Sequence, residues 1–133
     1  NGYYAGMNNA DELYVQEENV INKMAQKESC VIIGRCADFI LKDKKYVTKV
    51  LIYSDMEGKI KRAITYYGMN KEKAEKEIKR IDKLRANHYK HYTDQEWNDH
   101  SNYDLCINSD ALGVEKSAEL ICDFVKEKEL VTK

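Results

Sequence analysis

The sequence contains no proline, although average usage would give several in 133 residues. It contains no internal repeat, linker-like segment or low-complexity tract. No apolar run is long enough to span a membrane, and no stretch has the pattern of a signal peptide. These absences argue against a membrane-spanning or repetitive protein, and the length predicts a single domain, residues 1–133, or part of one.

Neither sign of charge dominates, because 22 basic and 23 acidic residues nearly cancel. The overall field therefore does not indicate a nucleic-acid partner. The cysteines at positions 30, 36, 106 and 122 lie in or beside apolar segments and lack the spacing of a metal site. They are typical of reduced, mostly buried thiols, and we expect a cytoplasmic protein.

A phosphate-binding loop of the form G-x-x-x-x-G-K-[ST] is also absent from the sequence. Such a loop cradles the phosphates of ATP with its backbone N–H groups, so this stretch has no means of its own to do so. The sequence begins with Asn1 rather than methionine. We therefore expect the whole protein to have a further N-terminal part.

Short apolar runs bounded by polar residues predict strands at 30–34, 47–53 and 103–108. Helices are expected between them, and strands that alternate with helices are typical of an α/β fold with a parallel sheet covered by helices on both faces. About fifty residues separate the second strand from the third. We expect this insertion, at about 56–100, to be helical and to project from the sheet as a lid.

Helical spacing of apolar residues also predicts where the helices begin and end. The expected helices cover 11–27, 37–41, a stripe from Met56 to Tyr67, a long charged helix after Asn70, a short helix around Trp97, and a last helix from Val114 to Val125. Asn9 or Asp11, Asn70, and a Thr93–Glu96 capping box are the expected N-caps, and Gly68 is the expected C-terminal stop.

The junction between the first predicted strand and Gly34-Arg35 is the most informative place in the sequence. In open α/β sheets, ligands bind beyond the carboxyl ends of the strands. The planar fork of an arginine such as Arg35 is well suited to phosphate. The alternative is a strand that ends in a glycine turn with a solvated arginine.

The segment 59–92 is rich in cations and contains interleaved acids. Most of these charges are typical of a solvated helical face with i,i+4 pairs, such as Glu72–Lys76 and Glu75–Lys79. Three other residues favour a functional role. Arg62 lies near the start of the insertion, and Asp82 and Arg85 lie three residues apart, where an aspartate can orient a guanidinium toward a polyanion.

Histidines and tyrosines cluster at 88–92. His88 and His91 share a helix face, but no nearby cysteine or paired acid completes a metal site, so none is expected. Mixed bases and aromatics also occur on RNA-binding surfaces. The other interpretation is a tyrosine-rich helix end that packs a lid against its domain.

Four sequence segments, in their order along the chain, resemble those of the cytidylate kinase-like proteins, relatives of cytidylate kinase among the P-loop nucleoside monophosphate kinases. They are Val31–Arg35, Lys59–Arg62, Asp82–Tyr89 and Tyr103–Asn108, and the resemblance extends from Asp11 to about Glu129. It implies a P-loop NTPase fold of the nucleotide kinase type. This sequence would be its C-terminal two-thirds, without the central strand that feeds the phosphate loop and lies between the strands at 30–34 and 47–53.

The resemblance implies an ATP- and Mg²⁺-dependent phosphotransferase that acts on a nucleoside monophosphate or a similar small acceptor. The implied catalytic residues are Arg62, which closes over the transferring phosphate, and Arg85. The implied acceptor-binding residues are Arg35, Asp38 and Asp82, and the segment Asn108-Ser109-Asp110 would lie beside the donor adenine. No membrane partner is implied.

The sequence departs from true cytidylate kinases at Ile33, Cys36 and Ile78, where the family usually carries two acids and an arginine. The identity of the acceptor therefore stays open, with Asp38 as the acid nearest to Arg35. Two other functions also stay open. One is a degenerate, non-catalytic family member that binds a nucleotide or a protein, and the other is an RNA-binding module.

Overall fold

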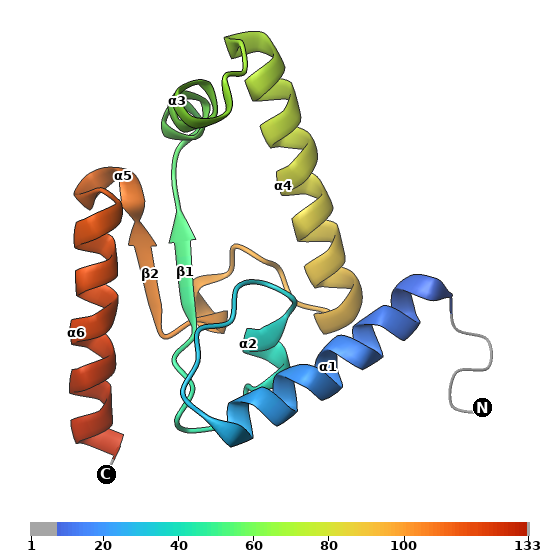
Figure 1. The fold of residues 1–133 in the computed structure, drawn as a ribbon, viewed down its shortest axis with the longest axis vertical. Coiled ribbons are helices and arrows are strands. Elements are labelled where there is room, and N and C mark those ends of the chain that lie inside the picture. The colour runs from blue at the N-terminus through green and yellow to red at the C-terminus, as the bar shows by residue number, and fades with distance from the viewer. Residues whose placement is uncertain (1–7, 133) are drawn as a thin grey trace. The chain divides into compact units, whose positions relative to one another are not determined.

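A computed structural model describes residues 8–132 of the chain, which divides after Val47 into two compact units. The first unit contains helices α1 (Asn9–Lys27) and α2 (Ala37–Ile40). The second contains β1 (Val50–Tyr53), α3 (Met56–Tyr67), α4 (Lys71–Thr93), the 3₁₀ helix η2 (His100–Asn102), β2 (Leu105–Asn108), α5 (Ser109–Leu112) and α6 (Val114–Thr132) (Figure 1). The structure is thus helix-rich α/β with a small parallel sheet.

In the first unit, α1 and α2 enclose a small apolar core. Ile21, Ala37 and Leu41 are buried there, and Ile32 packs against them. The N-cap of α1 is Asn8, whose side chain accepts a hydrogen bond from the N–H of Asp11 at 2.8 Å. The predicted cap at Asn9 or Asp11 was therefore wrong by one to three positions, because several neighbouring residues have side chains that can cap.

The strand predicted at 30–34 is not formed. Residues 30–33 pair with no strand in the described part of the chain, and Val31 and Ile33 are 90% and 88% exposed. Strand structure exists only through hydrogen bonds to a neighbouring strand. Since residues 8–132 place no strand beside this run, the apolar residues alone do not make it a strand.

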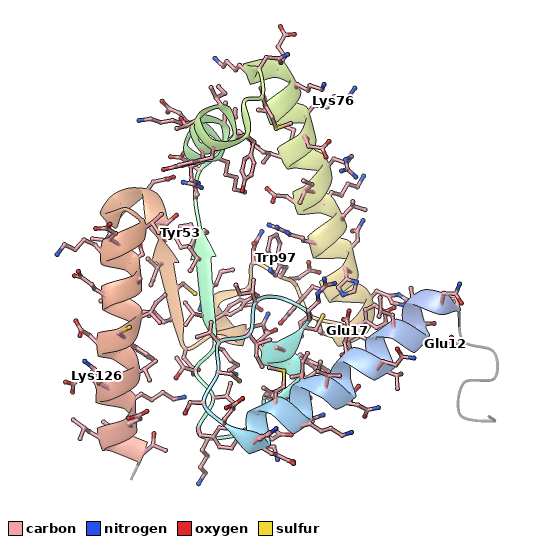
Figure 2. The ribbon with its side chains drawn as sticks, in the orientation of Figure 1. Glu12, Glu17, Tyr53, Lys76, Trp97 and Lys126 are labelled. Atoms are coloured by element: carbon pink, nitrogen blue, oxygen red, sulfur yellow. The ribbon has the colours of Figure 1, made fainter. Side chains whose placement is uncertain are left out.

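The strands β1 and β2 are parallel, as predicted for the segments 47–53 and 103–108. Their register pairs Val50 with Leu105 and Tyr53 with Asn108. Both carboxyl ends therefore lie at one edge of the sheet, where Figure 2 labels Tyr53. Helix α6 lies alongside β2 (Figure 1), but Ile52 is 54% exposed, so helices within the second unit cover the sheet only in part.

The predicted insertion forms two helices, α3 and α4, which pack on each other. Gly68 ends α3 with a left-handed backbone (φ 64°), a conformation that glycine adopts without steric cost. The side chain of Asn70 then caps α4 by accepting from the N–H of Lys73 at 2.9 Å. Both signals were predicted, because each acts within a few residues of its own position.

The short helix predicted around Trp97 is absent, and Thr93 is the last residue of α4 rather than an N-cap. The hydroxyl of Thr93 donates to the carbonyl of Tyr89 at 2.7 Å and accepts from the N–H of Gln95 at 3.1 Å. The same hydroxyl that would cap a new helix thus closes the last turn of the old one. A 3₁₀ turn capped by Asp99 follows instead.

The last helix was predicted correctly, and α6 extends that prediction to Thr132. The single turn of α5, between β2 and α6, was not predicted. Across residues 8–132, none of the helices combines the length and the apolar composition that crossing a bilayer requires.

Candidate functional site

The candidate site lies at the carboxyl edge of the two-stranded sheet, within the second unit. After β1, the chain passes through Ser54 and Asp55 into α3, and after β2 it turns directly into α5 at Ser109. The hydroxyl of Ser109 donates to the carbonyl of Tyr53 at 3.3 Å and so links the two strand ends. Ligands bind at this edge in open α/β sheets.

Asp110 is the centre of the polar contacts at this edge. Its Oδ2 accepts hydrogen bonds from the hydroxyl of Ser54 at 2.6 Å and from the N–H of Asp55 at 3.0 Å. Its Oδ1 accepts from Nη1 of Arg62 at 3.1 Å. One carboxylate therefore joins the β1–α3 junction, helix α3 and helix α5.

Gly58 makes room for this carboxylate. A Cβ atom on Gly58 would stand 2.4 Å from Oδ1 of Asp110, far inside van der Waals contact. The N–H of Gly58 also donates to the N-cap side chain of Asp55 at 2.7 Å. A side chain at this position would therefore force the carboxylate of Asp110 to move.

The pKa of Asp110 lies below its usual range, first because the hydroxyl of Ser54 donates to its carboxylate and next because the N–H of Asp55 does. Arg62 lowers the pKa further. Asp110 is therefore ionised at neutral pH. Sequence reasoning placed it in the segment beside the donor adenine and gave it no role of its own. The local sequence signal for Asp110 was its position two residues after the last residue of a predicted strand.

Arg62, the predicted catalytic arginine of the insertion, lies on α3 at this edge. Its side chain is 38% exposed, and its one polar partner in residues 8–132 is Asp110. A guanidinium carries five N–H donors, so most of the hydrogen-bonding capacity of Arg62 is available to a ligand.

Asp82 does not form the predicted pair with Arg85. Its carboxylate accepts instead from Nζ of Lys59, on α3, at 2.6 Å. The spacing along α4 suggested a local partner, but the packing of α3 on α4 brings a cation within reach from 23 residues away. The side chain of Arg85 is exposed and has no polar partner within the described residues.

Arg35 lies in the first unit, in a turn of left-handed backbone. Gly34, Arg35 and Cys36 have φ angles of 68°, 59° and 58°. Left-handed backbone costs a residue with a side chain about 1–2 kcal/mol, and such strain is often retained at binding turns. Nη1 of Arg35 lies 3.6 Å from Oε1 of Glu17, and the side chain is 65% exposed.

Cys36 and Asp38 follow in the same turn and in α2. Cys36 is buried, and this burial, with the nearby carboxylates of Asp38 and Glu17, raises the pKa of its thiol to about 11. Asp38 is half-buried in the first turn of α2. The roles in acceptor binding that the resemblance implies for Arg35 and Asp38 stay predictions.

Most charges of α4 form the solvated face that was predicted. Lys79 pairs with Glu75 at 3.1 Å, and Arg80 pairs with Glu77. Figure 2 shows Lys76 pointing outward from α4, and within the described residues Lys76 has no ion-pair partner, including the predicted Glu72.

Neighbouring rings in the aromatic cluster at 88–92 contact one another. The ring of Tyr92 makes edge contacts with His88 at 4.9 Å and with His91 at 4.6 Å between centroids. Tyr89 is buried, and its hydroxyl donates to Gln95 at 3.0 Å. This arrangement favours a packed helix end over a surface on which bases stack.

Comparison with known proteins shows the family of the chain and a similar solved structure. The model of the cytidylate kinase-like family matches residues 1–111, which include both strands and Asp110. The crystal structure of an uncharacterized protein from Eubacterium ventriosum ATCC 27560 is similar, with a TM-score of 0.84 and 29% identity over 91% of this chain and 69% of that chain. No curated protein matches. The chain belongs to the cytidylate kinase-like family.

Proposed function

We propose that the protein is an ATP-dependent phosphotransferase that moves the γ-phosphate of ATP to a nucleoside monophosphate or a similar small acceptor. The observation that carries this proposal is the position of Arg62 and the availability of its remaining N–H donors. In a cytidylate kinase-like chain, Arg62 stands at the carboxyl edge of a parallel strand pair, anchored through one nitrogen and otherwise available to an anion.

Phosphoryl transfer requires positioning and charge neutralisation more than covalent catalysis. In this proposal, Arg62 neutralises the transferring phosphoryl group and Arg85 binds the acceptor phosphate, while Arg35 and Asp38 keep the acceptor-binding roles that the resemblance implies. Asp82, held by Lys59, binds the acceptor sugar. Asn108 and Ser109, at the end of β2, lie on the side of the donor adenine, and α3 and α4 form the lid.

The donor set of Arg62 fits the phosphates of ATP, because a guanidinium binds oxyanions through paired N–H groups. ATP would bring Mg²⁺ on its phosphates, as is usual where one or two carboxylates and the nucleotide share the ion. Among the described residues, no three His, Cys, Asp or Glu side chains gather as a metal site. The proposal therefore assigns no protein ligand to Mg²⁺.

The test is a phosphotransfer screen of the full-length protein with Mg²⁺ and γ-labelled ATP over nucleoside monophosphates and other small hydroxyl compounds. We expect transfer to one acceptor class, and a loss of about 10³–10⁵ in rate for Arg62→Ala, by analogy with arginine fingers. Arg80→Ala is the matched control, since Arg80 lies on the solvated face of α4 and pairs only with Glu77 within residues 8–132.

Three other outcomes of this screen have distinct meanings. ATP binding without transfer to any acceptor would favour a degenerate, non-catalytic member of the family. Absence of both ATP binding and transfer would reject the proposed function. Equal losses in Arg62→Ala and Arg80→Ala would remove Arg62 from the reaction.

A further inference from the structure

We propose that Asp110 is a positioning residue for Arg62, which it holds at the carboxyl edge of the sheet with its remaining N–H donors turned to the substrate phosphates. This inference rests on the proposed function, because it concerns the arginine of the transfer step. In this proposal, Asp110 at the β2–α5 junction orients Arg62 of α3.

The carboxylate of Asp110 is itself fixed in place. Two neutral donors, the hydroxyl of Ser54 and the N–H of Asp55, occupy Oδ2 at 2.6 and 3.0 Å. The missing side chain of Gly58 leaves the space that Oδ1 fills. Oδ1 is therefore presented to α3 at a defined place, and Arg62 meets it there.

The guanidinium of Arg62 is anchored through one nitrogen. Arg62 uses only Nη1 for this contact, at 3.1 Å. Its Nε and Nη2 bond to no other group in the described residues. An arginine that is anchored through one nitrogen loses less conformational freedom when it binds a phosphate than one that is free to rotate.

Helix α3 is tethered to two other elements of the second unit. Lys59 bonds to Asp82 of α4, and Arg62, three residues further along α3, bonds to Asp110 of α5. Residues three apart lie on neighbouring positions of one helix face. The two ion pairs thus fix both the rotation of α3 and the position of its arginine at the sheet edge.

Asp110→Asn separates positioning from simple structural support. The amide oxygen of asparagine can still accept from Ser54 and from the N–H of Asp55. Its NH₂ group replaces Oδ1 and cannot accept from Arg62. Glu119→Gln is the matched control, because it removes one carboxylate from an exposed pair with Lys116 on α6.

The first measurement does not depend on catalysis. In ¹⁵N spectra of the arginine side chains, we expect resolved Nη signals for Arg62 in the wild-type protein, because the carboxylate hinders rotation of the guanidinium. Asp110→Asn should average these signals, and Glu119→Gln should leave them unchanged. If the Arg62 signals are the same in Asp110→Asn and in the wild type, the proposal is wrong.

The second measurement is kinetic. We expect Asp110→Asn to lower kcat by on the order of 10- to 100-fold, the scale of a misplaced catalytic group, and to leave both KM values within about twofold. The double variant Asp110→Asn/Arg62→Ala should be no slower than Arg62→Ala, because both changes remove the same positioned guanidinium. Multiplied losses would mean that Asp110 acts independently of Arg62 and would overturn the proposal.

The two measurements also separate this inference from the proposed function. A wild-type protein that transfers phosphate to no acceptor would reject the proposed function, and with it the role of Asp110 in transfer. The side-chain spectra would still show whether the pair exists. An active enzyme in which Asp110→Asn keeps its full kcat would overturn this inference and leave the proposed function intact.

Discussion

Nζ of Lys59 lies 2.6 Å from Oδ2 of Asp82, and this hydrogen bond joins the first turn of α3 to the middle of α4. Both side chains are about 30% exposed. The pair belongs to the two helices that we propose as a lid. Its partners could not be matched from the sequence, because the spacing on α4 favoured Arg85.

Breaking this pair should loosen α3 on α4. We expect Lys59→Met and Asp82→Asn each to lower the free energy of unfolding by about 1 kcal/mol or less, the range for a solvent-accessible ion pair. A double-mutant cycle in urea measures their coupling, with Lys79→Met, from the i,i+4 pair on α4, as control. Strictly additive effects would contradict a stabilising interaction between Lys59 and Asp82.

Gly58→Ala should destabilise the protein. In a helix, exchange of glycine for alanine normally adds roughly 0.5–1 kcal/mol of stability, but here the new Cβ would collide with the carboxylate of Asp110. We therefore expect Gly58→Ala to lower the urea midpoint of unfolding, whereas an ordinary helix position would show an increase. In an Asp110→Ala background, Gly58→Ala should again stabilise the protein. If Gly58→Ala alone stabilises the protein, the close approach of the Asp110 carboxylate to Gly58 is contradicted.

The carboxylate of Asp110 should contribute stability that depends on pH. Its pKa in the folded protein lies below the unfolded value of about 3.9, first because Ser54 donates to it. Its contribution is therefore fully present above that unfolded value and is lost as the pH falls through the lowered one. Urea unfolding from pH 7 to pH 3 should show the difference between wild type and Asp110→Asn shrinking below about pH 4. A difference that stays constant with pH would contradict this assignment.

The thiol of Cys36 should be the slowest to react in the native protein. With a pKa of about 11, its thiolate fraction at pH 8 is on the order of 10⁻³, and the side chain is buried. Cys30 and Cys122 are exposed. Labelling with an alkylating reagent, followed by mass spectrometry of the peptides, should find Cys30 and Cys122 modified first. Labelling of Cys36 at the rate of Cys122 would contradict the described turn.

The sequence was a good guide wherever the determining interactions are local. Gly68 and Asn70 were recognised as the end of one helix and the cap of the next, because each acts on backbone groups within four residues. The parallel pairing of β1 with β2 was also predicted, since strands joined through helices run in the same direction. The role of Arg62 in phosphoryl transfer comes from the family resemblance and stays a prediction.

The sequence by itself thus determined the longer helices of the second unit, α3, α4 and α6, the direction of its two strands and the membership in the cytidylate kinase-like family. Only the tertiary structure decided which charges of different elements meet. The run Cys30–Ile33 has the composition of a strand but, in the described residues, no strand beside it. Asp82 meets Lys59, and Asp110 meets Arg62 across 48 residues. These outcomes depend on how α3 and the strand ends pack, because ladder hydrogen bonds and ion pairs require a partner that local sequence does not specify.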